Sequence, residues 1–314
     1  MSPNGSERST LANELISASN PGGGWSYYPG KASRLEPTTW SLLALARNRT
    51  VPSAFDPSRH RDFLAGCQRP DGWVVENTSW PVNVAFNALV AFVWLTRPEL
   101  ADHNRVDPLV NALVRSKGVQ VPPSPSLAQD NSLQGWSWNL DTFSWVEPTA
   151  WGVLALKKAV RSGVLNEASA APRIQEGERL LIDRCCRGGG WNFGNPNVLG
   201  NDLYPHAPTT AIALLALQDQ PQHAVVARSL TFLEKQWREE QSLLALGLSL
   251  ICLTSHGRSI VDLEDKLRAH VTAQSSSPST SPHTETRLPS NSLHGSAVAL
   301  CALSLNDNEG AFRI

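Results

Sequence analysis

Residues 136–156 read WSWNLDTFSWVEPTAWGVLAL and place four tryptophans in and beside the start of an apolar run. The stretch has near copies at residues 22–46 and 188–217, and a more divergent copy at residues 68–92. Each copy contains Gly-Trp, then a polar and aromatic connector, then a proline that opens an apolar run. Because both residue order and spacing recur, the pattern predicts a repeat architecture.

Each repeat is predicted to be a helical hairpin. The prolines are expected in the first turns of helices, where a missing N–H costs nothing; they are Pro37, Pro81, Pro148 and Pro208. The runs behind them are apolar nearly all round, which is typical of helices buried on every side. The runs before each Gly-Trp are amphipathic and predict outer helices with one solvated face.

The whole chain of 314 residues is predicted to be one domain. Two further hairpins lack Gly-Trp, so six are expected, at about residues 8–46, 58–96, 107–160, 173–219, 223–254 and 259–305. A Ser/Pro/Thr-rich tract at residues 274–291 is interpreted as a flexible loop. An open array needs polar caps at its ends, and neither end has one. The two ends are therefore expected to meet, which gives an all-α fold: a six-hairpin α/α toroid, or barrel, with inner and outer rings of helices.

Composition excludes several classes of protein. Lys and Arg number 27 and Asp and Glu 28, for a formal charge of −1, which argues against a nucleic-acid-binding protein. No run of 18 apolar residues predicts a transmembrane segment, and the first residues do not resemble a signal peptide. Five sparse cysteines indicate reduced thiols, so a cytoplasmic location is expected.

The repeats resemble a known superfamily. The stretch FLAGCQRPDGW at residues 63–73 is similar to the Gln-Trp repeat of squalene and hopene cyclases. From about residue 8 to residue 305 the chain resembles the prenyltransferase and squalene-cyclase repeat superfamily, the terpenoid-cyclase-like α/α toroids. The resemblance implies an aromatic-lined cavity for an isoprenoid or other apolar small molecule. Prenyltransferase β subunits require a second subunit to complete their site, so the resemblance makes a second protein subunit a possible partner and leaves open whether one is needed.

The chain departs from the catalytic signatures of that superfamily. The Asp-x-Asp-Asp motif of class II terpene cyclases is absent, and the stretch NLDTFS offers only Asp141. His294 matches the position of the zinc-binding histidine of prenyltransferases, but the expected Asp-Gly-Cys is replaced by a segment with Asp202 and no cysteine beside it. Whether the chain is an enzyme is therefore left open, with a terpene cyclase-like or prenyltransferase-like activity favoured.

Polar residues precede the inner helices and are expected to surround one opening of the barrel. The candidate catalytic residues are Glu36, Glu147, Asp202, His206 and His294. Glu36 and Glu147 both precede Pro-Thr, where a carboxylate stabilises the N-terminus of a helix. The same two side chains could instead form a pair that performs acid–base chemistry.

A metal site is a further hypothesis. Asp202, His206 and His294 combine imidazole and carboxylate ligands, which zinc accepts, and magnesium is the other divalent ion considered. Histidines at helix starts also serve as polar caps, and no metal-binding motif links these residues, so no cofactor is assigned on sequence alone.

Aromatic residues near the same opening are candidates for binding substrate. They are Trp40, Trp80 and Trp151, with Tyr28 and Trp145 from the connectors. Rings at these positions could wedge between inner helices, or they could line a pocket and stabilise a carbocation with their π faces.

Three functions are compatible with the sequence. The first is an enzyme that transforms an isoprenoid or similar apolar substrate in the barrel. The second is a non-catalytic binding or scaffold module that kept the toroid and lost its chemistry. The third is a carbohydrate-active α/α barrel, for which Asp141 and Asp202 would supply the pair of carboxylates.

Overall fold

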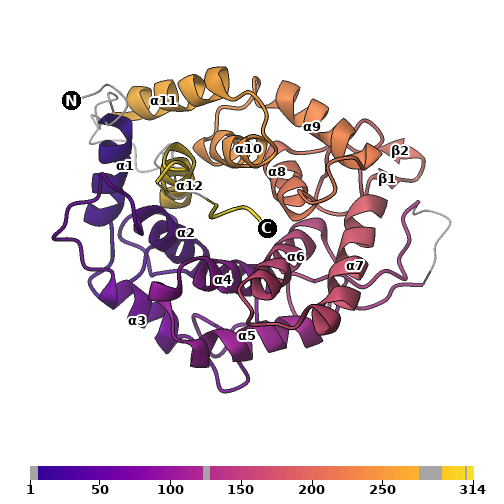
Figure 1. Cartoon of the computed structure of the whole chain (residues 1–314), viewed down its shortest axis with the longest axis horizontal. Helices are drawn as coiled ribbons and strands as arrows, with labels where there is room; N and C mark the ends of the chain where they lie inside the picture. The colour runs from indigo at the N-terminus through magenta and orange to yellow at the C-terminus, as the bar shows by residue number, and fades with distance from the viewer. Residues whose placement is uncertain (1–5, 123–127, 276–291, 308–309) are drawn as a thin grey trace, which may run out of the picture.

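Twelve α-helices make up most of the part of the chain that the computed structural model describes, which is residues 6–122, 128–275, 292–307 and 310–314. They form two concentric rings (Figure 1). The outer helices are α1 (Ser6–Ser17), α3 (Ser58–Gly66), α5 (His103–Arg115), α7 (Glu167–Asp183), α9 (Ala224–Gln236) and α11 (Val261–Ser275). The inner helices are α2 (Leu35–Leu45), α4 (Val84–Thr96), α6 (Val146–Arg161), α8 (Ala207–Ala216), α10 (Leu243–Ser255) and α12 (Leu293–Leu303).

The inner ring is closed. Each inner helix packs against the next, and α12 packs against α2. The Leu293 N–H donates to the Tyr27 carbonyl oxygen at 2.8 Å, and Asn48 Nδ2 donates to Ser304 Oγ at 3.0 Å, so main chain and side chains both join the first and last repeats. The prediction of an all-α toroid with inner and outer rings is confirmed.

Closure also gives the first outer helix a partner. Helices α3, α5 and α7 pack on α2, α4 and α6, so an outer helix covers the inner helix that precedes it in the chain. By this rule α1 has no predecessor in sequence, and it packs on α12 instead. The buried face of α1, formed by Leu11, Ala12 and Leu15, is therefore removed from water only because the ring closes.

A shared set of hydrogen bonds explains the Gly-Trp and Pro-Thr elements of the repeat. In three repeats the main-chain N–H of the tryptophan donates to a threonine hydroxyl of the following inner helix: Trp25 to Thr38 at 2.8 Å, Trp136 to Thr149 at 3.0 Å, and Trp191 to Thr210 at 2.9 Å. The indole N–H groups donate to main-chain carbonyls of the preceding outer helix, at Leu15, Leu113 and Leu181. Each tryptophan thus joins two helices, and all three rings are fully buried.

The second repeat is offset by one residue from the sequence-based alignment. There the Val74 N–H takes the place of the tryptophan N–H and donates to Asn87 Oδ1 at 2.7 Å. Gly72 adopts a positive φ of 96°, as Gly23 does at 92°, so Trp73 corresponds to Gly24 rather than to Trp25. The expectation that Pro81 opens the inner helix is wrong: α4 begins at Val84, and Asn83 caps it by accepting from the Phe86 N–H.

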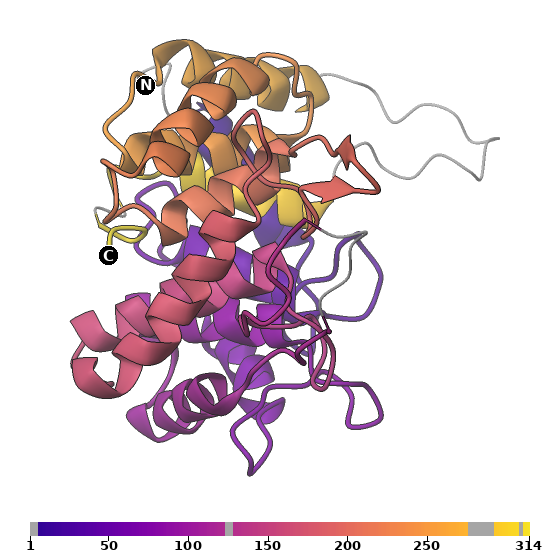
Figure 2. The same cartoon turned by 90° about the vertical axis from the view of Figure 1, so that its right-hand side faces the viewer.

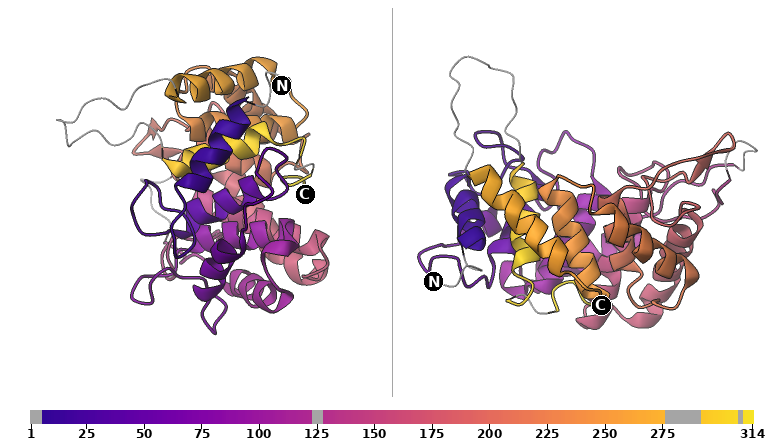
Figure 3. Two further views of the ribbon diagram at one scale, coloured as in Figure 1. Left: turned by 90° about the vertical axis from the view of Figure 1, so that its left-hand side faces the viewer. Right: turned by 90° about the horizontal axis from the view of Figure 1, so that it is seen from above.

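The two faces of the ring differ. The long connectors from outer to inner helices, with the hairpin of β1 (Asn197–Val198) and β2 (Asn201–Asp202), lie on one face, and the C-terminal segment lies toward the other (Figures 2 and 3). A short 3-10 helix, η2 (Pro98–Leu100), follows α4. The predicted flexible loop at 274–291 lies outside the described residues from residue 276 onward, and α11 extends to Ser275. Within the described ranges, no helix combines the length and apolar character needed to cross a membrane.

Candidate functional site

Two glutamates from different repeats lie at the connector end of the inner ring. Glu36 lies in the first turn of α2 and Glu147 in the first turn of α6, at equivalent positions before Pro-Thr. Each carboxylate begins a helix whose free N–H groups carry partial positive charge, as a capping role would require. The charge of Glu36 nevertheless acts on Glu147, so the two groups form an electrostatic pair.

Glu147 is the most perturbed acid of this group. Its pKa is raised from the ordinary value of 4.5 to about 8, first by burial and then by the negative charge of Glu36, and a hydrogen bond from Trp151 opposes the rise. At neutral pH Glu147 is therefore mainly a neutral carboxylic acid that can donate a proton.

Glu36 is held by two neighbours. The Tyr27 hydroxyl donates to Glu36 Oε2 at 2.5 Å, and His294 Nε2 lies 3.6 Å from Glu36 Oε1. Burial, followed by the charge of Glu36, raises the pKa of Tyr27, so its hydroxyl remains a hydrogen-bond donor. His294 Nε2 is buried and has no hydrogen-bond partner in the described part of the chain.

The closure of the ring brings Tyr27 and His294 together. Because the carbonyl of Tyr27 accepts from the Leu293 N–H, the first connector is fastened to the first residue of α12. The rings of Tyr27 and His294 then lie edge to face, with centroids 6.1 Å apart. Tyr27, Glu36 and His294, from the first and sixth repeats, are thus in contact, and Glu147 of the third repeat interacts with Glu36 through its charge.

An aromatic layer lies next to these groups. Trp40 and Trp151 meet with ring centroids 5.8 Å apart, and Phe92 lies 5.9 Å from Trp151. Phe312, from the C-terminal segment, lies 6.0 Å from Trp40 and 5.6 Å from Phe92. None of the four rings is more than 3% exposed, so side chains fill the lumen at this level.

The structure places the other candidate residues outside this group. Asp202 is exposed on β2, where it faces Arg187 at 3.5 Å and accepts from Asn197 Nδ2 at 2.8 Å. His206 is exposed at the start of α8, with its ring 5.0 Å from that of Phe193. No hydrogen bond, ion pair or ring contact among the described residues joins Asp202 or His206 to Glu36, Glu147 or His294. Of the five candidate residues, the structure therefore brings together Glu36, Glu147 and His294 and leaves Asp202 and His206 apart from them, and their catalytic role stays a prediction.

The connector aromatics also lie apart. Trp80 is 45% exposed and its ring stacks under the Arg34 guanidinium at 4.8 Å. It belongs to the connector before α4, and the offset of the second repeat explains why it does not align with Trp40. Tyr28 is half-buried beside Tyr27, and its carbonyl accepts the Ser26 hydroxyl.

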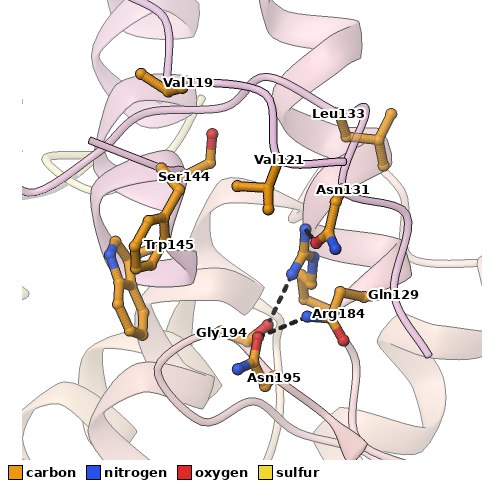
Figure 4. Close-up of a pocket in the computed structure, with 11 residues that line it drawn as sticks. Val119, Val121, Gln129, Asn131, Leu133, Ser144, Trp145, Arg184, Gly194 and Asn195 are labelled. Carbon is orange, nitrogen blue, oxygen red and sulfur yellow. Dashed lines mark hydrogen bonds between the residues drawn. The ribbon is translucent and has the colours of Figure 1, made fainter. Parts of the chain in front are cut away.

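Trp145 lines a separate hollow of about 190 Å³ on the connector face (Figure 4). Val121 and Leu133 supply apolar surface to its walls, and amides and a buried arginine supply polar groups. Arg184 donates to the Gly194 carbonyl at 3.3 Å and Gln129 to Asn195 Oδ1 at 2.7 Å, so two connectors are joined across it.

The part of the chain that the structure describes contains no group of side chains that could bind a metal ion. No three His, Cys, Asp or Glu side chains there come close enough to hold an ion. The expectation of zinc or magnesium bound by Asp202, His206 and His294 therefore remains a sequence-based hypothesis without a grouped donor set.

Sequence reasoning missed Tyr27, Phe92 and Phe312. Tyr27 stands directly before the predicted Tyr28, and only the structure shows that Tyr27 is the one whose hydroxyl reaches Glu36. Phe92 lies within a helix that is apolar on all sides. Nothing in the local sequence indicates that its ring faces the lumen rather than a neighbouring helix. Phe312 lies beyond the last repeat, where periodicity carries no information.

Comparisons with known proteins agree with this architecture. No family model matches the chain. A drimenyl diphosphate synthase from Streptantibioticus cattleyicolor is 41% identical over 58 residues, which is 18% of this chain and 10% of that enzyme. The chain thus spans a small part of the length of that relative.

Solved structures match over nearly the whole chain. The type II terpene cyclase MstE from Scytonema is 16% identical, with 98% of both chains covered and a TM-score of 0.57. A β-1,3-1,4-glucanase from Paenibacillus sp. X4 is 10% identical, with 96% of this chain and 91% of that chain covered and a TM-score of 0.58. A glycosidase is 11% identical, with 98% of both chains covered and a TM-score of 0.62. At these identities the likeness is one of fold, and the chain has the α/α toroid fold that these terpene cyclase and glycosidase structures share.

Proposed function

We propose that the protein is an acid-catalysing enzyme that transforms an isoprenoid or similarly apolar substrate, with Glu147 as the proton donor. The observation that carries the proposal is the protonated, buried carboxyl of Glu147 beside Glu36 and next to a layer of aromatic rings. The MstE structures include a complex with geranylgeranyl dihydroxybenzoate as substrate, which supports an apolar, prenyl-bearing ligand in a ring of this fold.

Glu147 would act as a general acid. A carboxyl whose pKa is near 8 is protonated at neutral pH and still acidic enough to release its proton in a reaction. Its hydrogen bond from Trp151 holds the acid against the ring layer. Glu36, which accepts from Tyr27, would receive a proton from the product side or return one to Glu147.

The rings of Trp40 and Trp151 would stabilise the positive charge that protonation of a carbon–carbon double bond creates. Aromatic faces attract cations within about 6 Å of the ring centroid, and the interaction strengthens when water is excluded. Both rings are almost completely buried, so a substrate would reach them only where neighbouring side chains move aside, and the cation would then be shielded from water. An apolar chain gains free energy from burial at such a surface, whereas a strongly polar ligand would lose its hydration.

The proposal includes a cytoplasmic location and an apolar small-molecule partner. The five cysteines are free thiols, which suits a reducing compartment.

Turnover of prenylated substrates tests the proposal. The purified protein is incubated with geranylgeranyl dihydroxybenzoate and with farnesyl diphosphate, and cyclised or rearranged products are sought by mass spectrometry. Glu147→Gln should lower turnover by about 100-fold or more, the usual contribution of a general acid. Asp202→Asn, an exposed carboxylate on β2, is the matched control and should leave turnover unchanged. Equal turnover by wild type and Glu147→Gln would remove Glu147 from the mechanism.

Glycoside hydrolysis is a second candidate, favoured by the glycosidase and glucanase structures of the same fold and by the carboxylate pair. It would use Glu36 and Glu147 in place of the predicted Asp141 and Asp202. Asp141 is exposed, and Asp202 faces Arg187. Release of reducing sugar from mixed-linkage β-glucan, lost in Glu147→Gln, would favour this candidate over the first.

A further inference from the structure

The C-terminal segment enters the ring from the face opposite the connectors. In Figure 1 the C-terminal residues lie in the centre of the inner ring. Ala311 and Phe312 are each 3% exposed, and the ring of Phe312 lies against Trp40 and Phe92. A segment outside every helix therefore supplies one of the four rings that fill the lumen.

A side chain of α6 and one from the turn after α8 hold this segment by its main chain. Lys158 Nζ donates to the carbonyls of Gly310, Ala311 and Arg313 at 3.3, 3.0 and 3.1 Å. Gln218 Nε2 donates to the Phe312 carbonyl at 2.8 Å, and Gln218 Oε1 accepts from the Ile314 N–H at 3.3 Å. Because two side chains make these contacts, the attachment is concentrated at two points.

Space for movement lies beside the segment. A hollow of about 270 Å³ is bounded by Thr254, Ser255 and Leu305 on one side and by residues 310–313 on the other. A core ring is normally enclosed by partners on every side. Here the segment that carries Phe312 has packing on the lumen side and free volume on the other.

We propose that residues 310–314 form an internal plug whose Phe312 ring sets how long an apolar chain the lumen accepts. The proposal rests on the proposed function, because it assigns the space next to Trp40, Phe92 and Trp151 to the far end of the substrate. With the plug seated, Phe312 closes that space. Substitution by a small residue opens a pocket lined by apolar rings, and apolar cavities of this kind stay dry and bind apolar guests.

Calorimetric titration with prenyl alcohols of different length tests the plug in the full chain. The probes are farnesol and geranylgeraniol, which differ by one five-carbon unit. Phe312→Ala should bind geranylgeraniol about tenfold more tightly than wild type does, because the additional carbons become buried, while farnesol affinity stays within about twofold. Lys158→Met, which removes three contacts to the segment and keeps Phe312, should shift the preference in the same direction.

Phe55→Ala is the control for general loss of a ring, because Phe55 packs beside His60 away from the lumen. The same length preference in wild type, Phe312→Ala and Lys158→Met would overturn the proposal. If no prenyl alcohol binds any variant, crystals of Phe312→Ala and wild type under xenon pressure decide. Xenon bound next to Trp40 and Phe92 in Phe312→Ala, and not in wild type, would support the plug even though the proposed function had failed. If Phe312→Ala binds no xenon at that place, the plug is overturned as well.

Discussion

Trp40 and Trp151 stand at equivalent positions of the first and third repeats and meet edge to face, with ring centroids 5.8 Å apart and ring planes at 73°. Each follows its threonine of the Gly-Trp lock by two residues, so the same local structure aims both rings at the lumen. Trp151 also donates to Glu147, one turn earlier on α6. The aromatic layer and the acid are therefore parts of one arrangement.

Trp151→Phe should raise the pKa of Glu147 above its present value of about 8. The indole N–H stabilises the charged carboxylate, and phenylalanine keeps most of the packing while removing that donor. The pKa can be followed by carbon NMR of labelled glutamate side chains, with Glu147→Gln used to assign the signal. A pKa that stays the same or falls would show that the indole does not donate to this carboxyl.

Glu147→Gln should stabilise the fold at alkaline pH. Because the folded-state pKa is raised from 4.5 to about 8, the folded protein binds more protons than the unfolded chain between these values, and its stability falls as pH rises through that window. The loss is on the order of a few kcal/mol above pH 8, at about 1.4 kcal/mol per pKa unit. Glutamine does not ionise, so the variant keeps its stability over this pH range.

Urea unfolding at pH 5 and pH 9 measures this effect. The variant and wild type should differ little at pH 5, and the variant should be the more stable at pH 9. Glu239→Gln, at an exposed position after α9, is the control and should track wild type at both pH values. A Glu147→Gln variant without any gain at pH 9 would contradict the raised pKa.

Thr149→Val should destabilise the third repeat by about 1 to 3 kcal/mol, because the buried Trp136 N–H loses its acceptor while shape is conserved. Denaturant unfolding monitored by circular dichroism gives the free energy of unfolding. Thr231→Val removes a hydroxyl that donates to the Ala227 carbonyl on the exposed side of α9, and should cost less than about 0.5 kcal/mol. Equal losses in the two variants would mean that the lock contributes no specific stability.

Asn48→Ala should loosen the closure of the ring. Asn48 is buried, donates to Ser304, and accepts from Arg8 at 3.2 Å, so its loss leaves polar groups of the first and last repeats unpaired. We expect a loss of about 1 to 3 kcal/mol and faster hydrogen exchange in α1 and α12 than in α6. Asn201→Ala, on the exposed β2, is the control. If hydrogen exchange became faster to the same extent in all helices, Asn48 would not act specifically on the contact between the first and last repeats.

Much of the candidate site could be anticipated from the repeats. Glu36 and Glu147 were identified because each precedes Pro-Thr, and Trp40 and Trp151 because each lies one turn later. His206 and Asp202 were grouped with them on the assumption that every connector reaches the same opening. The fourth connector instead folds into the β1–β2 hairpin, which places Asp202 in solvent opposite Arg187. Connector length, rather than helix register, decided that outcome.

Local sequence determined the helical hairpins, the alternation of amphipathic and buried helices, and the Gly-Trp lock, because periodicity, glycine conformation and hydroxyl acceptors act over spans of about 13 residues. Only the tertiary structure decided which groups meet across the ring. Tyr27, Glu36, Glu147 and His294 come from three repeats, and Phe312 comes from beyond the last one. Closure brings Tyr27 and Glu36 next to His294, and contacts between segments so far apart leave no periodic trace in the chain.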